Sequence, residues 1–195
     1  VQFYLGVVMA KAEYRSAIRS RKLINEALVD LLLEKQLDKI TVTDVVKRAE
    51  INRGTFYAHY KDIKDVINHW VEEAFSSIRD AIAMSQSSLM DMPHALLTQV
   101  QTILEENLDF YRKIMNSSAS IFIEEQLVQV VLDYLLEHEM DFAGENYEQY
   151  AFKVRFSAGG LSNLYREWFE GHVPMTLDEL TIQAEKVIKG IIGTK

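Results

Sequence analysis

The chain has 195 residues, of which 48% are hydrophobic and 26% charged, a composition typical of a folded globular protein. It contains no cysteine, which excludes disulfide bonds and thiolate metal sites and fits a reducing compartment, so we expect a cytoplasmic protein. Only two prolines and eight glycines interrupt the sequence, which favours long helices over short strands, and no segment has the roughly 20 apolar residues of a membrane span.

The charge is distributed unevenly along the chain, whose net charge is −8. Residues 11–64 contain twelve Lys or Arg and eight Asp or Glu, whereas residues 66–195 contain nine Lys or Arg and twenty Asp or Glu. A basic end on an acidic body is typical of a protein that contacts DNA through that end. The alternative is ordinary surface charge with no function.

A first amphipathic helix is predicted from Ser16 to Leu37, where apolar residues recur at helical spacing. Four basic residues crowd its start: Arg15, Arg19, Arg21 and Lys22. Basic residues at a helix N-terminus oppose the helix dipole, so they do not serve helix stability. We interpret them as contacts to phosphate, with a solvated basic surface as the alternative.

Two short helices follow, joined by a tight turn. Thr41 and Asp44 have the spacing of a capping box, at the start of a helix that ends at Glu50 and Ile51. Asn52 is a favoured N-cap for the next helix, from Arg53 to Tyr60. Two helices separated by about three residues predict a helix-turn-helix corner, whose second helix fits the major groove of DNA.

The rest of the chain predicts helices, with no strand alternation and no internal repeat. The expected ranges are Ile63–Met84, Asp91–Glu106, Leu108–Met115, Ser120–Glu139, Tyr147–Glu170 and Thr176–Ile192, the last of which begins with a capping box between Thr176 and Glu179. We therefore expect an extension of unknown role at residues 1–14, a helix-turn-helix DNA-binding domain at residues 15–62 and a helical body at residues 63–195. The opening residues 1–9 lack the basic region and cleavage site of a signal peptide.

Residues 24–71 resemble the TetR family of bacterial transcriptional regulators. The similarity is carried by ITVTDV at residues 40–45 and by INRGTFYAHYKDIKDV at residues 51–66. It implies an all-α fold, with an N-terminal three-helix helix-turn-helix DNA-binding domain and a C-terminal helical ligand-binding and dimerisation domain. It also implies a homodimer on a palindromic operator in double-stranded DNA, most often a repressor released by a small-molecule effector. The alternative is a co-regulator of the same fold that acts through a protein partner or ligand rather than its own operator.

Two residues depart from the family pattern. Glu50 occupies the turn position where the family usually has glycine. A non-glycine residue at positive φ costs about 1 kcal/mol, so either the turn geometry differs or packing around Ile51 absorbs the strain. Val46 stands where a small alanine is usual. Neither residue is among those expected to face DNA.

The residues expected to contact DNA lie on and around the third helix. The predicted base-contacting residues are Arg53, Gly54, Thr55, Tyr57 and Ala58, of which Arg53 is suited to bond guanine with two hydrogen bonds. The predicted phosphate-contacting residues, which set register without specifying sequence, are Thr43, His59, Tyr60, Lys61 and Lys64. For Tyr60 a core role is the alternative, and for His59 a solvated position.

The last two helices are the predicted dimer interface, because one recognition helix contacts too few base pairs for useful specificity. The interface residues are Phe156, Gly159, Gly160, Leu164, Trp168, Leu180, Val187, Ile188 and Ile191. A close helix crossing would explain two adjacent glycines inside a helix, where each costs about 1 kcal/mol. The resemblance also implies a ligand pocket in the body, for which the candidates are Phe110, Tyr111, Met115, Phe122, Tyr134, Phe152 and Tyr165, with plain core packing as the alternative for each.

Enzyme motifs are missing from the sequence. The five histidines do not show the spacing of a zinc-binding helix. No nucleophile elbow, phosphate-binding glycine loop or dinucleotide fingerprint occurs. Two adjacent acidic pairs, 105–106 and 124–125, point in different directions from a helix and are not suited to paired acid–base work. We expect neither catalysis, nor a metal site, nor a cofactor.

Overall fold

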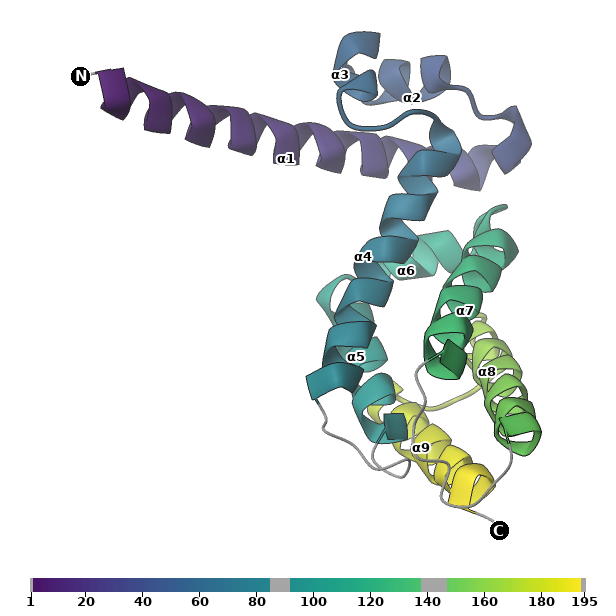
Figure 1. Cartoon of the computed structure of the whole chain (residues 1–195). Helices are drawn as coiled ribbons and strands as arrows, with labels where there is room; N and C mark the ends of the chain where they lie inside the picture. Colours follow the sequence, from purple (N-terminus) through teal and green to yellow (C-terminus); the bar gives the residue numbers. More distant parts are fainter. Residues whose placement is uncertain (1, 85–91, 138–146, 194–195) are drawn as a thin grey trace. The chain divides into compact units, whose positions relative to one another are not determined.

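The computed structural model describes residues 2–84, 92–137 and 147–193, and every regular element in these ranges is a helix (Figure 1). The elements are α1 (Gln2–Glu34), the 3₁₀ helix η1 (Leu37–Lys39), α2 (Val42–Arg48), α3 (Arg53–Tyr57), α4 (Ile63–Met84), α5 (Met92–Glu106), α6 (Leu108–Met115), α7 (Ser120–Glu137), α8 (Tyr147–Phe169) and α9 (Leu177–Gly193). The predicted all-α fold is confirmed. None of these helices has the length and apolar character that a membrane crossing requires.

The chain forms two compact units. The first contains residues 1–69 together with the short segment 117–119, and the second contains residues 70–116 and 120–195. Helix α4 is shared, because its first turns belong to the first unit and its remainder to the second.

The first unit is built around the C-terminal half of α1, against which α2 and α3 pack (Figure 1). Its core is formed by apolar side chains from these three helices and from the start of α4. Those that are at most 2% exposed are Ile24, Leu28, Val29, Leu32, Val45, Phe56, Val66 and Ile67. The helical spacing of the α1 residues therefore reports the buried side of that helix, as predicted.

The second unit is a helical body in which α9 packs on α5 and α8, and α8 packs on α7. Helix α9 begins with the predicted capping box: Thr176 Oγ1 accepts from the Glu179 amide at 3.2 Å, and Glu179 Oε2 accepts from the Thr176 amide at 2.9 Å. One side of α9 supplies Leu180, Ala184 and Ile188 to the core at spacings of four residues.

Several helix ends differ from the predicted ranges. Helix α1 begins at Gln2 instead of Ser16, and residues 2–15 contain a single glycine and no proline to stop it. It ends at Glu34, before the 3₁₀ turn that contains Leu37. Helix α3 ends at Tyr57. The expected cap Asp91 and the expected helix end at Glu139 lie outside the described residues.

Candidate nucleic-acid interface

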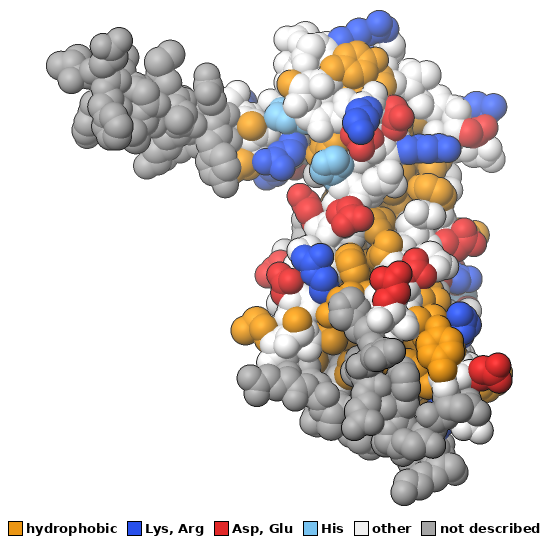
Figure 2. Space-filling model, in the orientation of Figure 1, with side chains coloured by type: hydrophobic (Ala, Val, Ile, Leu, Met, Phe, Trp, Pro, Cys, Tyr) orange, Lys and Arg blue, Asp and Glu red, His pale blue; other side chains and the backbone are white. Residues whose placement is uncertain are grey.

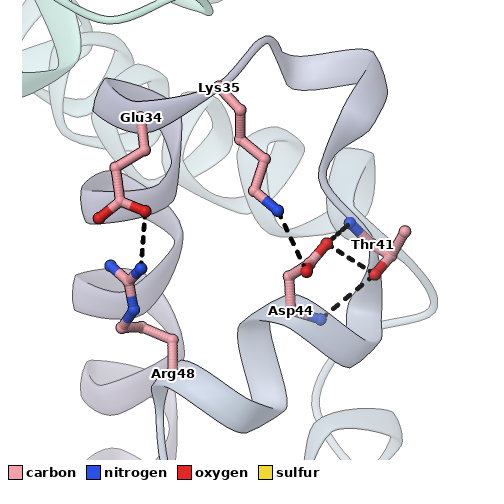
Figure 3. A network of polar contacts seen from close by, with 5 residues as sticks. All are labelled: Glu34, Lys35, Thr41, Asp44 and Arg48. Atoms are coloured by element: carbon pink, nitrogen blue, oxygen red, sulfur yellow. Dashed lines mark hydrogen bonds and ion pairs between the residues drawn. The ribbon is translucent and has the colours of Figure 1, made fainter.

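Helix α2 is fixed to the end of α1 by a network of polar contacts (Figure 3). The predicted capping box is present, since Thr41 Oγ1 accepts from the Asp44 amide at 3.2 Å and Asp44 Oδ2 accepts from the Thr41 amide at 2.9 Å. Lys35 Nζ lies 3.1 Å from Asp44 Oδ1, and Arg48 Nη2 lies 2.7 Å from Glu34 Oε2. Hydrogen bonds from Thr41, then from Lys35, lower the pKa of Asp44 to about 2, so its carboxylate stays ionised at neutral pH.

The turn between α2 and α3 is a Schellman motif. Ala49 is the C-cap, and the Ile51 amide donates to the Val46 carbonyl at 3.1 Å, the long return bond of this motif. The residue between them, Glu50, has φ of 53° and is the only non-glycine residue with positive φ in the described ranges. The turn therefore keeps the geometry usual for glycine, and Glu50 holds it at a conformational cost.

Helix α3 starts at the predicted N-cap. Asn52 Oδ1 accepts from the Thr55 amide at 2.8 Å and from the Thr55 hydroxyl at 3.2 Å. A Cβ added at Gly54 would lie 3.1 Å from Asn52 Oδ1, closer than nine in ten real contacts of that kind. Glycine at position 54 thus protects the cap geometry, in addition to the close approach to DNA that we predict for it.

The first residue of α3 bonds to the second residue of α2. Arg53 Nη2 donates to Thr43 Oγ1 at 2.7 Å, and both side chains are exposed. The sequence predicted a base contact for Arg53 and a phosphate contact for Thr43, but no contact between them. Ten residues separate the two, and only the geometry of the turn brings them together.

The remaining predicted base-contacting residues differ in exposure. Tyr57 is 56% exposed, Ala58 and Gly54 are exposed, and Thr55 is half-buried. Phe56 is fully buried and is the inward-facing residue of α3. The exposed side of α3 therefore carries four of the five residues that we predict to contact bases, and Thr55 is the exception.

Tyr60 does not lie with the phosphate-contacting candidates. Its side chain is 4% exposed, its ring contacts Phe56 and His69, and its hydroxyl donates to Asn25 Oδ1 at 3.5 Å. It is a core residue of the first unit, which was the alternative role, and we withdraw its phosphate contact.

His59 lies close to the basic start of the first predicted helix. Partial burial, then the nearby charge of Arg21, lowers the pKa of His59, so its imidazole is neutral at pH 7. The sequence showed that basic residues crowd around Arg21, but it did not show that Arg21 lies close to His59. His59 can therefore offer an uncharged N–H to a phosphate, with Arg21 supplying the charge beside it.

Lys61 and Lys64 flank the start of α4. Asp62 Oδ1 accepts from the Asp65 amide at 2.8 Å, and Asp65 Oδ2 accepts from the Lys61 amide at 2.8 Å. These carboxylates are used by the backbone, and neither lysine forms an ion pair within the described ranges. Lys, Arg and His side chains are visible at several places on the first unit in Figure 2.

Helices α8 and α9 present an exposed apolar surface. Phe152 and Phe156 are 70% and 62% exposed and stack with centroids 6.3 Å apart, and Val187 on α9 is 61% exposed. Gly159 and Gly160 are exposed, and a Cβ at either would have no neighbour within 4 Å among the residues that the structure describes. Nothing in that part of the chain therefore explains the two glycines.

Three predictions about the second unit need correction. Leu180 and Ile188 are 0% and 7% exposed and belong to the core against α5, because α9 is apolar on two sides and these residues occupy the inner one. Phe152 is 70% exposed on α8, which does not fit its predicted place in the lining of a pocket. Leu164, Trp168 and Ile191 are half-buried.

The other pocket candidates are half-buried in the second unit, where aromatic rings meet edge to face. Phe110 contacts Trp70 and Tyr111, with centroid distances of 5.5 and 5.4 Å. Tyr134 contacts Phe75 at 5.8 Å. Tyr111 and Tyr165 both pack against the cluster of Leu104, Leu177 and Leu180. The half-buried candidates are Phe110, Tyr111, Met115, Phe122, Tyr134 and Tyr165.

Two buried hydroxyls lie close together between α8 and α9. Burial raises the pKa of the Tyr165 phenol to about 12, an effect that the Thr181 hydroxyl partly offsets. Within residues 2–84, 92–137 and 147–193, neither hydroxyl makes a hydrogen bond of normal geometry, and the same holds for the buried indole nitrogen of Trp70. Buried polar atoms of this kind are uncommon and are suited to hold a polar group of a ligand or a water molecule.

The end of α8 carries a cluster of ionisable side chains. Gly171, with φ of 81°, forms a Schellman end in which the His172 amide donates to the Glu167 carbonyl at 2.9 Å, and His172 Nδ1 lies 3.0 Å from Glu167 Oε2 and 3.3 Å from Glu170 Oε2. These three ligand-type atoms lie within 4.8 Å of one another at an exposed position. We interpret the cluster as a hydrogen-bonded helix end, because His172 Nδ1 lies within hydrogen-bond distance of both carboxylates.

A family model matches the second unit. Residues 91–190, which are 100 of the 195 residues, match the TetR model described as "Transcriptional regulator C-terminal region". The chain belongs to the TetR family. The resemblance seen in residues 24–71 is thereby confirmed from a part of the chain that carries none of its motifs.

Two curated relatives and one solved structure resemble this TetR-family regulator. An uncharacterised helix-turn-helix regulator of Bacillus subtilis, YxbF, is 30% identical over 74 residues, which span 37% of this chain and only 20% of that protein. The dhaKLM operon transcriptional activator DhaS of Lactococcus lactis is 25% identical over 159 residues, which span 78% of this chain and 81% of that protein. The fatty acid degradation regulator FadR of Bacillus halodurans has the same fold, with a TM-score of 0.63 at 13% identity over 88% of this chain and 95% of that one.

Proposed function

We propose that this TetR-family regulator binds a palindromic DNA operator as a homodimer, through α2 and α3 of each chain. The observation that carries the proposal is the exposed side of α3. There Arg53 bonds only to the neutral hydroxyl of Thr43 within the described ranges, beside exposed Tyr57 and Ala58. An arginine without a carboxylate partner keeps its charge available for a guanine edge. Lys61, Lys64 and Arg21 supply the phosphate-neutralising charge around it.

The exposed apolar surface of α8 and α9 supports the homodimer. Exposed large apolar side chains such as the stacked Phe152 and Phe156 on α8 and Val187 on α9 are suited to a protein–protein contact. Gly159 and Gly160 would allow a helix of the second chain to approach closely, since a Cβ at either would meet no described residue of its own chain within 4 Å. A two-fold dimer then presents two copies of α3 to the two halves of a palindrome.

A small molecule bound in the second unit would regulate DNA affinity. The half-buried aromatic residues and the unpartnered polar atoms of Trp70, Tyr165 and Thr181 support a binding site there. The chain itself links the units at two places. Helix α4 runs through both, and Ser118, between α6 and α7, donates through its amide to the Leu32 carbonyl at 3.3 Å and through its hydroxyl to the Lys35 carbonyl at 2.9 Å. A ligand that favours one conformation of the second unit can thereby shift DNA affinity, typically by about 1–3 kcal/mol.

Repression and activation are both candidates for the outcome of operator binding. Repression released by an effector is what the family resemblance implies. DhaS, which aligns with most of this chain, is named as an activator, and this observation favours activation. A co-regulator that depends on a protein partner would also have the α8–α9 surface, but without that partner it would not bind a specific DNA sequence.

Retention of genomic DNA fragments by the purified protein tests the proposal. We expect one or a few fragments to be retained at about 0.15 M salt, with two chains per site and a steep loss of affinity as salt increases. Retention that shows no preference among fragments would contradict an operator, and no retention would favour the partner-dependent co-regulator. A reporter gene under the retained promoter, compared with and without the regulator, distinguishes repression from activation.

A further inference from the structure

The hydrogen bond between Arg53 and Thr43 joins the starts of two helices. Thr43 is the second residue of α2 and Arg53 the first residue of α3. The distance of 2.7 Å from Arg53 Nη2 to Thr43 Oγ1 is typical of a strong hydrogen bond from a charged donor. Both residues are exposed, so burial does not force them together. Arg53 therefore forms this bond although its side chain could instead extend into solvent.

The backbone at both ends of this bond is held by caps. On one side, the Thr41–Asp44 capping box and the ion pair from Lys35 fix the first turn of α2. On the other, Asn52 caps α3 through the Thr55 amide. The backbone at both ends of the bond is thus fixed, and the bond restricts the Arg53 side chain, which would otherwise sample many rotamers.

The bond leaves the guanidinium able to contact a base. A guanidinium has five N–H donors, and the bond to Thr43 uses one of them. The remaining donors still include an adjacent pair that matches the N7 and O6 acceptors of guanine. No carboxylate of the described ranges pairs with Arg53, so contact with DNA requires no ion pair to break.

We propose that Thr43 is a positioning residue that holds the Arg53 guanidinium ready for a base edge, and that it thereby determines specificity at the base pair that Arg53 contacts. This inference rests on the proposed operator binding. It replaces the predicted role of Thr43 as a phosphate contact. Restricting a long side chain before binding lowers the entropy lost on binding, so removal of the Thr43 hydroxyl is expected to weaken operator binding about 3- to 10-fold.

A double-mutant cycle on the full-length protein tests the inference. The probe is the duplex that the wild-type protein enriches from a random-sequence library, together with the same duplex substituted one base pair at a time. The variants are Thr43→Val, which keeps the branched shape without the hydroxyl, Arg53→Ala, and the double variant. Thr43→Ser is the matched control, since it keeps the hydroxyl. Urea unfolding of each variant checks that α2 is intact.

Coupling between the two substitutions is the expected result. Thr43→Val should weaken binding about 3- to 10-fold and relax preference at the same base pair as Arg53→Ala, while Thr43→Ser stays close to wild type. In the Arg53→Ala background, Thr43→Val should have no further effect. An equal loss on every duplex, or additive losses in the cycle, would assign Thr43 to phosphate and overturn the inference. Wild-type protein that enriches no sequence would instead overturn the proposed function, and the inference with it.

Discussion

Replacing Glu50 with glycine should stabilise the protein, although Glu50 lies in a turn that the fold depends on. Its φ of 53° is the position that a Schellman motif reserves for a left-handed residue. The second such motif in the described ranges, at the end of α8, has Gly171 at φ of 81° in the same place. The two turns therefore allow a comparison at the same motif position, which is occupied by Glu50 in one turn and by Gly171 in the other.

The magnitude follows from two opposing effects. A side chain with a Cβ in the left-handed region costs about 1–2 kcal/mol relative to the right-handed helix. Glycine also makes the unfolded chain more flexible, which lowers the free energy of unfolding by about 0.4–1 kcal/mol and offsets part of the relieved strain. We therefore expect Glu50→Gly to raise the free energy of unfolding by about 0.5–1 kcal/mol relative to Glu50→Ala, which keeps the Cβ but removes the charge. Gly171→Ala should lower it by a similar amount.

Urea unfolding followed by circular dichroism measures these differences. With a slope of about 2 kcal/mol per molar urea, the expected separation of midpoints between Glu50→Gly and Glu50→Ala is about 0.3–0.5 M. Glu72, an exposed residue inside α4, provides the control. There glycine should be less stable than alanine by about 1 kcal/mol, the opposite sign. If glycine were also the less stable residue at position 50, packing around the turn would have removed the strain and the explanation would be wrong.

Three further predictions follow from the described contacts. Thr41→Ala removes the N-cap of α2 and should lower the free energy of unfolding by about 0.5–2 kcal/mol in urea; an unchanged midpoint would show that the remaining contacts, such as the Arg48–Glu34 pair, hold the helix without the cap. Because the folded pKa of Asp44 is about 2 and its ordinary value is 3.8, its contribution to stability is fully present above about pH 5 and is lost as pH falls from 4 towards 2. Asp44→Asn should therefore reduce the loss of stability measured over that range, and an identical pH profile would refute this role. Phe156→Glu should convert the proposed dimer into monomers, as measured by light scattering at micromolar concentration, whereas Ile121→Glu, at an exposed position on α7, should not.

Local signals predicted more of this structure than long-range ones. The capping residues Thr41, Asn52 and Thr176 were recognisable because a cap depends on residues three positions apart. The left-handed Glu50 was one of two alternatives that the family resemblance raised, because the family usually has glycine at this turn position.

The features that the sequence did not predict depend on which side of an element meets a neighbour. Helix α9 is apolar on two sides, so periodicity could not show that Ile188 is buried while Val187 is exposed. Phe152 and Phe156 share one side of α8, yet only the structure places Phe152 on the surface. The Arg53–Thr43 bond and the proximity of Arg21 to His59 both require the helix-turn-helix geometry to be complete.

The most direct test of the central claim, sequence-specific DNA binding, is the affinity of the full-length protein for two labelled duplexes of identical composition. One is the duplex enriched by the wild-type protein, and the other has the same base pairs in permuted order. Fluorescence anisotropy at about 0.15 M salt should show a preference of at least about 10³-fold for the enriched duplex. Equal affinities for the two duplexes would contradict the claim.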